Sequence, residues 1–298
     1  MTAVDLHNLV AIGFHIKPLG VISASASIGT TPIIVSDSGA NILANLDRLN
    51  TNINSIYSIT QTDTTTLNLS AVQSVQDSSI LMLLNLYNTL SVAITGTSSS
   101  DTIFGIGNGV INGCGGVDTI SLLCHTSKTQ DVIVFNSAVS TSNLEKVTGF
   151  LSTDKIQLAN SSTSLNGLTN LATGAVYNAG TVVTALIQTV TASNAFTVST
   201  SGIDMIDITG ATFTNITAVI SSLSSSSRGS TYATFGSNIA KGSHFLVQYT
   251  ASDGVHIAEI TQGATSNHLA STSTGVDLID LVGVTQHVNA ANLMILAA

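Results

Sequence analysis

The chain has 298 residues, of which only 8% are charged and 4% aromatic, and its 16 acidic against 7 basic residues give a net charge of −9. Because it has no positive field to attract phosphate backbones, we do not expect it to bind nucleic acid. Apolar residues are interspersed with Ser and Thr, and no uninterrupted run approaches the roughly 18 residues that cross a bilayer. We therefore expect no transmembrane segment.

The first 30 residues alternate loosely between apolar and polar side chains, with Ile12, Phe14 and Ile16 at apolar positions. This alternation predicts that residues 1–30 form a strand or an assembly arm, with the strand ending near Pro18. The N-terminus carries an acid and no Lys or Arg where a secretory signal is basic, so we do not expect a cleaved signal.

Residues 31–175 are predicted to hold two β-α units followed by glycine-rich turns. An apolar run at 33–35 is followed by Asp37 or Ser38, either of which can cap a helix, and by apolar residues at helical spacing from 42 to 49. The same order of strand and helix then recurs. The predicted elements are strands over 55–60, 67–69 and 91–94 and a helix over 71–86.

A degenerate nine-residue repeat follows in the sequence. The unit 113–121 keeps Gly113, Gly116 and Asp118 on the pattern Gly-Gly-x-Gly-x-Asp-x-apolar-x, while Cys114 takes the second glycine position. Glycine permits the positive φ of a tight turn, and aspartate with turn carbonyls offers the hard oxygen ligands that calcium prefers.

This pattern resembles the calcium-binding repeat of RTX proteins, which include bacterial surface proteins exported by type I secretion. The resemblance implies parallel strands coiled as a β-roll, calcium as a ligand, and export without a cleaved N-terminal signal. It also implies Asp118 and Asp101 as the first candidate ligands, because Gly109 stands where the preceding unit would carry its aspartate. A glycine-rich turn that holds no metal is the alternative.

The second half of the chain repeats one strand pattern. Residues 202–210 and 275–283 share the order Gly-apolar-Asp-x-Ile-x-apolar with residues 116–122, which predicts equivalent rungs of the fold. Asp204 and Asp277 occupy the first aspartate position of the two later rungs, and they are the next calcium candidates. Acids in turns at strand ends are the alternative interpretation.

A hairpin is predicted where residues 245–249 and 255–260 flank Asp253-Gly254, a strong turn signal. We predict a boundary around the glycines of 174–180. The predicted domains are an N-terminal arm over 1–30, β-α modules and a degenerate β-roll over 31–175, and a β-rich domain with a tail similar to a secretion signal over 176–298.

Catalytic motifs are missing, since the chain has no His-Glu-x-x-His, Gly-x-Ser-x-Gly or phosphate-cradling glycine loop. Cys114 and Cys124 do not form a Cys-x-x-Cys pair, and they carry no predicted role. The histidines lack metal-ligand spacing, and we interpret them as surface or strand-face residues, with a haem ligand as the minor alternative. They are His7, His15, His125, His244, His256, His268 and His287.

The predicted fold is mainly β, an elongated parallel β-roll or β-solenoid with a few short helices in the N-terminal half and a β-rich C-terminal half. The predicted function is that of a secreted structural protein of the bacterial cell surface, not an enzyme. We expect it to self-assemble into a lattice similar to an S-layer or into a filament, with calcium as cofactor and a cell-surface polysaccharide as a further partner. The alternative is an RTX-type adhesin or ligand-binding module that does not polymerise.

Overall fold

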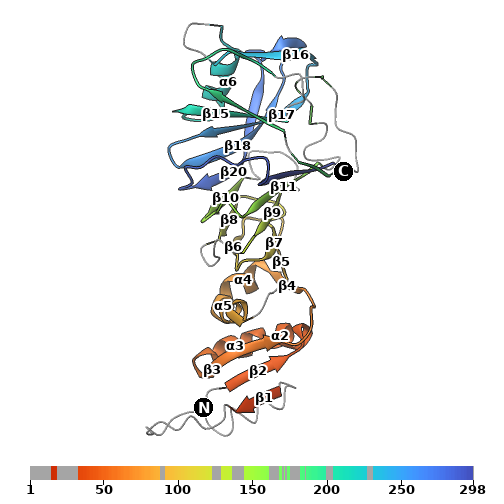
Figure 1. Cartoon of the computed structure of the whole chain (residues 1–298), viewed down its shortest axis with the longest axis vertical. Coiled ribbons are helices and arrows are strands. Elements are labelled where there is room, and N and C mark those ends of the chain that lie inside the picture. Colours follow the sequence, from red (N-terminus) through yellow and green to blue (C-terminus); the bar gives the residue numbers. More distant parts are fainter. Residues whose placement is uncertain are drawn as a thin grey trace.

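The computed structural model describes residues 15–18, 33–87, 91–122, 129–135, 144–160, 168–169, 171, 173–174, 182–184, 186–198, 204–226 and 231–297. Figure 1 shows an elongated molecule with three regions along its long axis. A small N-terminal sheet is followed by a narrow stack of short strands and then by broader sheets. The prediction of a mainly β chain is confirmed.

The N-terminal region is a three-stranded sheet with two short helices between its second and third strands. β2 (Ile33–Asp37) is parallel to β3 (Ile56–Gln61) and antiparallel to β1 (His15–Pro18). The helices are α2 (Gly39–Ala44) and α3 (Leu46–Thr51), followed by the 3-10 turn η1 (Ile53–Ser55).

The predicted helical spacing in this region is confirmed, because Ile42, Leu46 and Leu49 are all buried. Ser38, not Asp37, caps α2, since its hydroxyl accepts the backbone N–H of Asn41 at 3.3 Å. This bond pairs one of the N–H groups that the first turn of a helix leaves without a partner.

Two helices replace the single helix predicted over 71–86. After β4 (Leu67–Ser70) come α4 (Ala71–Gln76) and α5 (Ser78–Tyr87), separated at Asp77. The backbone of Asp77 leaves helical geometry at φ −101° and ψ 14°. Aspartate favours such breaks, because its short side chain competes for backbone hydrogen bonds in non-helical conformations.

Between residues 92 and 160 the successive strands alternate between two sheets. β5, β7, β9 and β11 lie in a seven-stranded sheet and β6, β8 and β10 in an eight-stranded sheet, and neighbours within each set are parallel. The strands are β5 (Val92–Thr95), β6 (Thr102–Phe104), β7 (Gly109–Asn112), β8 (Asp118–Ser121), β9 (Val132–Phe135), β10 (Glu145–Thr148) and β11 (Lys155–Asn160).

Each sheet of this stack lines up one row of apolar side chains on the core. In the eight-stranded sheet, Ile103 pairs with Ile120 and Ile120 with Val147, and all three are fully buried. The seven-stranded sheet carries an equivalent row of buried isoleucines at positions 94, 111, 133 and 156. Parallel pairing in constant register therefore repeats the same inward position from strand to strand.

The C-terminal half extends both sheets with mixed strand directions. The eight-stranded order is β13-β15-β17-β18-β20-β10-β8-β6, and the seven-stranded order is β12-β21-β11-β9-β7-β5-β4. β18 is antiparallel to β17 and β20, and β12 is antiparallel to β21. The added strands are β12 (Val182–Thr184), β13 (Ile187–Thr191), β15 (Met205–Thr212), β17 (His244–Thr250), β18 (Gly254–Thr261), β20 (Thr274–Val282) and β21 (Leu293–Ala297).

A second core lies beside the eight-stranded sheet. Helix α6 (Ile216–Ser224) begins after Asn215, whose side chain accepts the backbone N–H of Ala218 at 3.0 Å. Val219 and Leu223 of this helix are fully buried and belong to the core that also holds Phe245 and Tyr249. A further three-stranded sheet consists of β14 (Phe196–Thr197), β16 (Ala233–Ile239) and β19 (Ser266–His268).

Two expectations about the fold need correction. Because β12 and β18 run antiparallel, the sheets are mixed and the molecule is not one clear parallel β-roll. Helix α6 also lies in the C-terminal half, whereas the short helices are predicted in the N-terminal half. The hairpin predicted across Asp253-Gly254 is confirmed by the antiparallel pairing of β17 with β18.

Both large sheets combine residues from the two sides of the predicted boundary, because β20 pairs with β10 and β21 with β11. The boundary segment 175–180 and Cys124 lie outside the described residues, as does most of the predicted arm 1–30. The domain division therefore stays a prediction. Within the described part of the chain, no helix has both the length and the apolar character needed to cross a bilayer.

Candidate functional site

Two carboxylates lie side by side at the start of neighbouring strands in the stack. Asp118 is the first residue of β8 and Glu145 the first residue of β10, and the parallel register pairs them directly. Asp118 is 0% and Glu145 2% exposed. A buried acid is costly unless its charge is neutralised or paired, so this pair requires a compensating partner or protons.

The two carboxylates converge on the space above Gly113. A methyl group placed on Gly113 would lie 2.2 Å from Asp118 Oδ2 and 2.7 Å and 2.9 Å from the two carboxylate oxygens of Glu145. Only glycine leaves this space open. Oxygens that face one space at such short range are suited to ligate a cation.

Hydrogen bonding leaves part of each carboxylate unpaired. The backbone N–H of Asp101 donates to Asp118 Oδ1 at 2.8 Å. Asp118 Oδ2 and Glu145 Oε2 are buried and have no hydrogen-bond partner among the described residues. Burial, followed by the nearby charge of Asp118, raises the pKa of Glu145 to about 8. Burial also raises the pKa of Asp118. Protonation or a bound cation would satisfy the pair.

The neighbouring turn adds Asp101 to the same edge of the sheet. Asp101 Oδ2 accepts the backbone N–H of Thr97 at 2.5 Å and its hydroxyl at 2.8 Å. A methyl group placed on Gly96 would lie 2.9 Å from Asp101 Oδ2 and 2.4 Å from the carbonyl oxygen of Gly113. The structure therefore brings together Asp101 and Asp118, the first two predicted ligands.

The glycine-rich turn keeps its expected geometry despite the missing glycine. Gly116 has φ +108° and Cys114 has φ +71°. The backbone N–H of Cys114 donates to Asn112 Oδ1 at 2.9 Å. Burial raises the pKa of the Cys114 thiol, and the negative charges of Asp118, Glu145 and Asp101 raise it further. This thiol is therefore held as the neutral form.

The other two predicted ligands lie elsewhere and do not join this pair. Asp204 precedes β15, and its Oδ2 accepts the backbone N–H of Leu186 at 2.8 Å. Asp277 lies in β20 and accepts the hydroxyl of Tyr249 at 2.7 Å. The predicted rungs are also offset, because the residue of β20 that pairs with Glu145 is Ile279.

A second group of possible metal ligands lies at the β17–β18 hairpin. Asp253, His256 and Asp280 each offer a ligand atom, and these atoms all lie within 4.8 Å of one another. His256 Nε2 is 2.9 Å from Asp253 Oδ1 and 3.2 Å from Asp280 Oδ1. Burial lowers the pKa of His256, but its contacts with the carboxylates of Asp277, Asp280 and Asp253 outweigh burial and raise that pKa to about 10.

Histidines also face two other buried acids of the C-terminal sheets, Glu259 and Asp207. His244 forms an ion pair with Glu259, and this contact raises the pKa of His244 although burial lowers it. His287 Nδ1 forms an ion pair with Asp207 Oδ1. Burial raises the pKa of Asp207, but its hydrogen bonds, that with His287 foremost, outweigh burial and lower the pKa overall.

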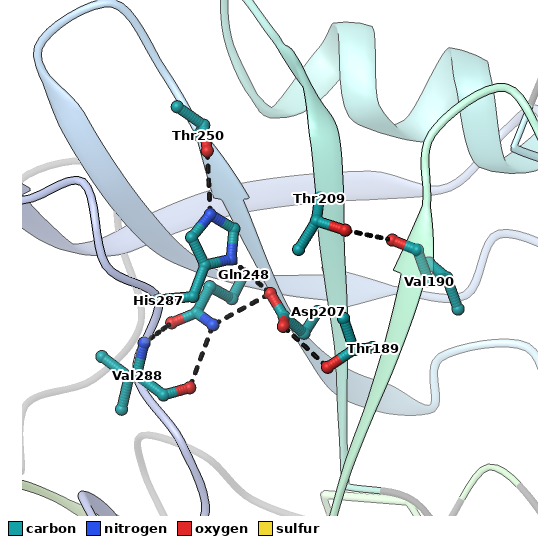
Figure 2. A network of polar contacts seen from close by, with 8 residues as sticks. All are labelled: Thr189, Val190, Asp207, Thr209, Gln248, Thr250, His287 and Val288. Carbon is teal, nitrogen blue, oxygen red and sulfur yellow. Dashed lines mark hydrogen bonds and ion pairs between the residues drawn. The ribbon is translucent and has the colours of Figure 1, made fainter.

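Figure 2 shows Asp207 at the centre of a polar network. Asp207 itself is buried. Its carboxylate accepts the hydroxyl of Thr189 at 2.9 Å and the side-chain amide of Gln248 at 3.0 Å. The amide of Gln248 also bonds both backbone polar groups of Val288, at 2.9 Å and 3.1 Å. We interpret this network as a clamp that fixes the segment after β20 onto β13, β15 and β17.

Sequence reasoning missed Glu145, His256 and Asp280 as members of these groups. Glu145 belongs to no glycine motif, and its only local signal is an acid at an inward position of a strand, two residues before Val147. The Asp253-Gly254 turn was predicted, and it is the local signal that could have placed Asp253 near His256. Asp280 joins them only through the cross-strand pairing of His256 with Asp280.

Comparison of the chain with protein-family models, with curated proteins and with solved structures gave no match.

Proposed function

We propose that the chain is a secreted structural protein of the bacterial cell surface that self-assembles into a lattice or filament, with calcium bound in its strand stack. The observation that carries this proposal is the convergence of Asp118 and Glu145 over Gly113. It occurs at the nonapeptide unit that resembles an RTX repeat. We further propose that the alternating parallel strands from 92 to 160 are a short, degenerate β-roll.

Calcium suits this site better than a softer metal. The available ligands are carboxylate oxygens and turn carbonyls, and calcium prefers six to eight such hard ligands at roughly 2.3–2.6 Å. Asp118 Oδ2 and Glu145 Oε2 have no hydrogen-bond partner among the described residues, so they are free to ligate. A divalent ion would also remove the cost of burying two like charges.

Self-assembly is supported by sheet edges and by exposed apolar side chains. Among the described strands, the edges of the eight-stranded sheet are β13 and β6, and those of the seven-stranded sheet are β12 and β4. Edge strands carry backbone groups that can pair with a second copy. Helices α4 and α5 also expose Val72 and Leu86, at 57% and 76%. Exposed apolar side chains of this kind favour contacts between molecules.

The experiment that tests this function is electron microscopy of the purified chain, paired with light scattering, in millimolar calcium and in chelator. We expect sheets or filaments with calcium and smaller particles without it. Glu145→Gln should assemble poorly in calcium, whereas Asp47→Asn, which alters an exposed acid outside the site, should behave as wild type. Monomers in every sample would contradict self-assembly.

The alternative function, an adhesin or ligand-binding module, is favoured by one observation. The β17–β18 hairpin presents Asp253, whose side chain is 52% exposed. A monodisperse monomer that binds a cell-surface polysaccharide through this loop would support the alternative. Calcium dependence would not separate the two functions, because either can use the ion for folding.

A further inference from the structure

The group at the β17–β18 hairpin has the spacing of a metal site built from one nitrogen and two oxygens. The distances from His256 Nε2 to Asp253 Oδ1 and Asp280 Oδ1 are 2.9 Å and 3.2 Å. Ligands bound tetrahedrally at about 2.0–2.1 Å lie roughly 3.3 Å apart. All three ligand atoms lie within 4.8 Å of one another, so adjustment of the side chains would place one ion between them.

One carboxylate oxygen in this group, Asp280 Oδ1, accepts no hydrogen bond from the described residues. Asp280 is 3% exposed, and its Oδ1 has no hydrogen-bond partner among the described residues, although it faces His256 Nε2. The single hydrogen on Nε2 is used by Asp253, which lies closer at 2.9 Å. A metal ion in place of this hydrogen would be coordinated by both carboxylates at once.

The opposite side of the imidazole is held by a buried tyrosine and a further carboxylate. His256 Nδ1 is 3.5 Å from the Tyr249 hydroxyl and 3.8 Å from Asp277 Oδ1, and that hydroxyl donates to Asp277 at 2.7 Å. Metal-binding histidines are commonly oriented by such contacts at their other ring nitrogen. Tyr249 is fully buried, so this support comes from the core.

We propose that Asp253, His256 and Asp280 bind one divalent first-row transition metal of the zinc type, with water in the fourth position. The half-exposed Asp253 gives the ion a route from solvent. Three ligands that include an imidazole favour zinc over calcium, which prefers a larger set of oxygen atoms. The ion would fasten the hairpin turn to β20, and this site is independent of the calcium proposed at Asp118 and Glu145.

The test is titration of the full, metal-stripped chain with Zn²⁺ by calorimetry and with Co²⁺ by visible absorption. We expect one equivalent to bind, with the strong visible bands of four-coordinate Co²⁺. His256→Gln should weaken Zn²⁺ binding at least tenfold, as should Asp253→Asn, which alters an exposed side chain and leaves the core intact. His268→Gln should bind as wild type and controls for adventitious histidine binding.

The same titration gives the results that would overturn the proposal. Either the absence of Zn²⁺ heat and Co²⁺ bands, or equal binding by wild type and a folded Asp253→Asn variant, would show that the group is only a histidine–carboxylate ion cluster. Excess Ca²⁺ should not displace Co²⁺. Displacement would also contradict the zinc-type assignment, whereas it would leave the calcium proposal in the stack standing.

Discussion

The strand stack and the C-terminal sheets bury acids in different ways. In the stack, Asp118 and Glu145 face each other, and an oxygen of each has no hydrogen-bond partner among the described residues. In the C-terminal sheets, three of the buried acids, Asp207, Glu259 and Asp280, each face a histidine. The pair in the stack therefore needs either protons or the cation that we propose there, whereas these three acids of the C-terminal sheets already face a group that can carry a positive charge.

The largest expected effect comes from filling the space above Gly113. Gly113→Ala would place a methyl group 2.2 Å from Asp118 Oδ2, so the carboxylates would have to move. We expect a loss of about 3 kcal/mol in unfolding free energy and no stabilisation by calcium. Urea unfolding with calcium and with chelator measures both.

Gly115→Ala is the matched control, because its nearest atom outside the adjoining residues would lie 3.6 Å away. It should cost well under 1 kcal/mol and keep the calcium response. Equal losses in the two variants would mean that the space above Gly113 has no special role.

A smaller effect is expected from Glu145→Gln in chelator. The pKa of Glu145 is raised from 4.5 to about 8, so its protonation stabilises the fold fully below pH 4.5, and this contribution is lost as the pH rises towards 8. The variant should lose less stability than wild type over this range, by about 2 kcal/mol or more. Superimposable stability curves for the two proteins would refute the assignment.

In the C-terminal sheets the corresponding change is His256→Gln, again with metal removed. The pKa of His256 is raised from 6.5 to about 10, so the charged form contributes stability that is fully present below pH 6.5 and disappears as the pH passes 10. We expect wild type to lose about 1–2 kcal/mol more than the variant between pH 6.5 and 10. Calcium should not alter this difference, which distinguishes it from that of Glu145.

Apart from the Gly115→Ala control, the smallest effect is expected at helix α4, which precedes the stack in the chain. Ser70 forms a capping box with Gln73 at the start of α4. Ser70→Ala should cost about 1 kcal/mol. The loss measured by urea unfolding should be the same in calcium and in chelator, and a calcium-dependent loss would show that α4 is coupled to the ion site.

Local patterns in the sequence predicted the elements better than their assembly. The apolar run at 33–35, the spacing from Ile42 to Leu49 and the Asp253-Gly254 turn each depend on neighbouring residues, and each was predicted correctly. The order and direction of strands depend on pairings between distant segments. The antiparallel strand β18, which makes the eight-stranded sheet mixed, was therefore predicted as half of a hairpin but not as a neighbour of β20.

The candidate site could be predicted only in part, because one of its two carboxylates lies in a local motif and the other is placed by strand pairing. Asp118 stands in a motif whose spacing has a physical meaning, because glycine turns and an aspartate recur at fixed intervals. Glu145 reaches the site only because β10 pairs in parallel with β8. No local pattern in the sequence predicts the register of that pairing. Asp204 and Asp277 fit the motif, but their strands are placed elsewhere, so the motif alone did not tell which of the four aspartates lie together.

Calcium calorimetry on the metal-stripped chain near neutral pH tests the central claim most directly. Wild type should bind calcium, whereas Glu145→Gln and Asp118→Asn should each bind at least tenfold more weakly, and Asp47→Asn should match wild type. Equal calcium binding by wild type and a folded Glu145→Gln variant, or none by wild type, would contradict the claim that this buried carboxylate pair holds the ion.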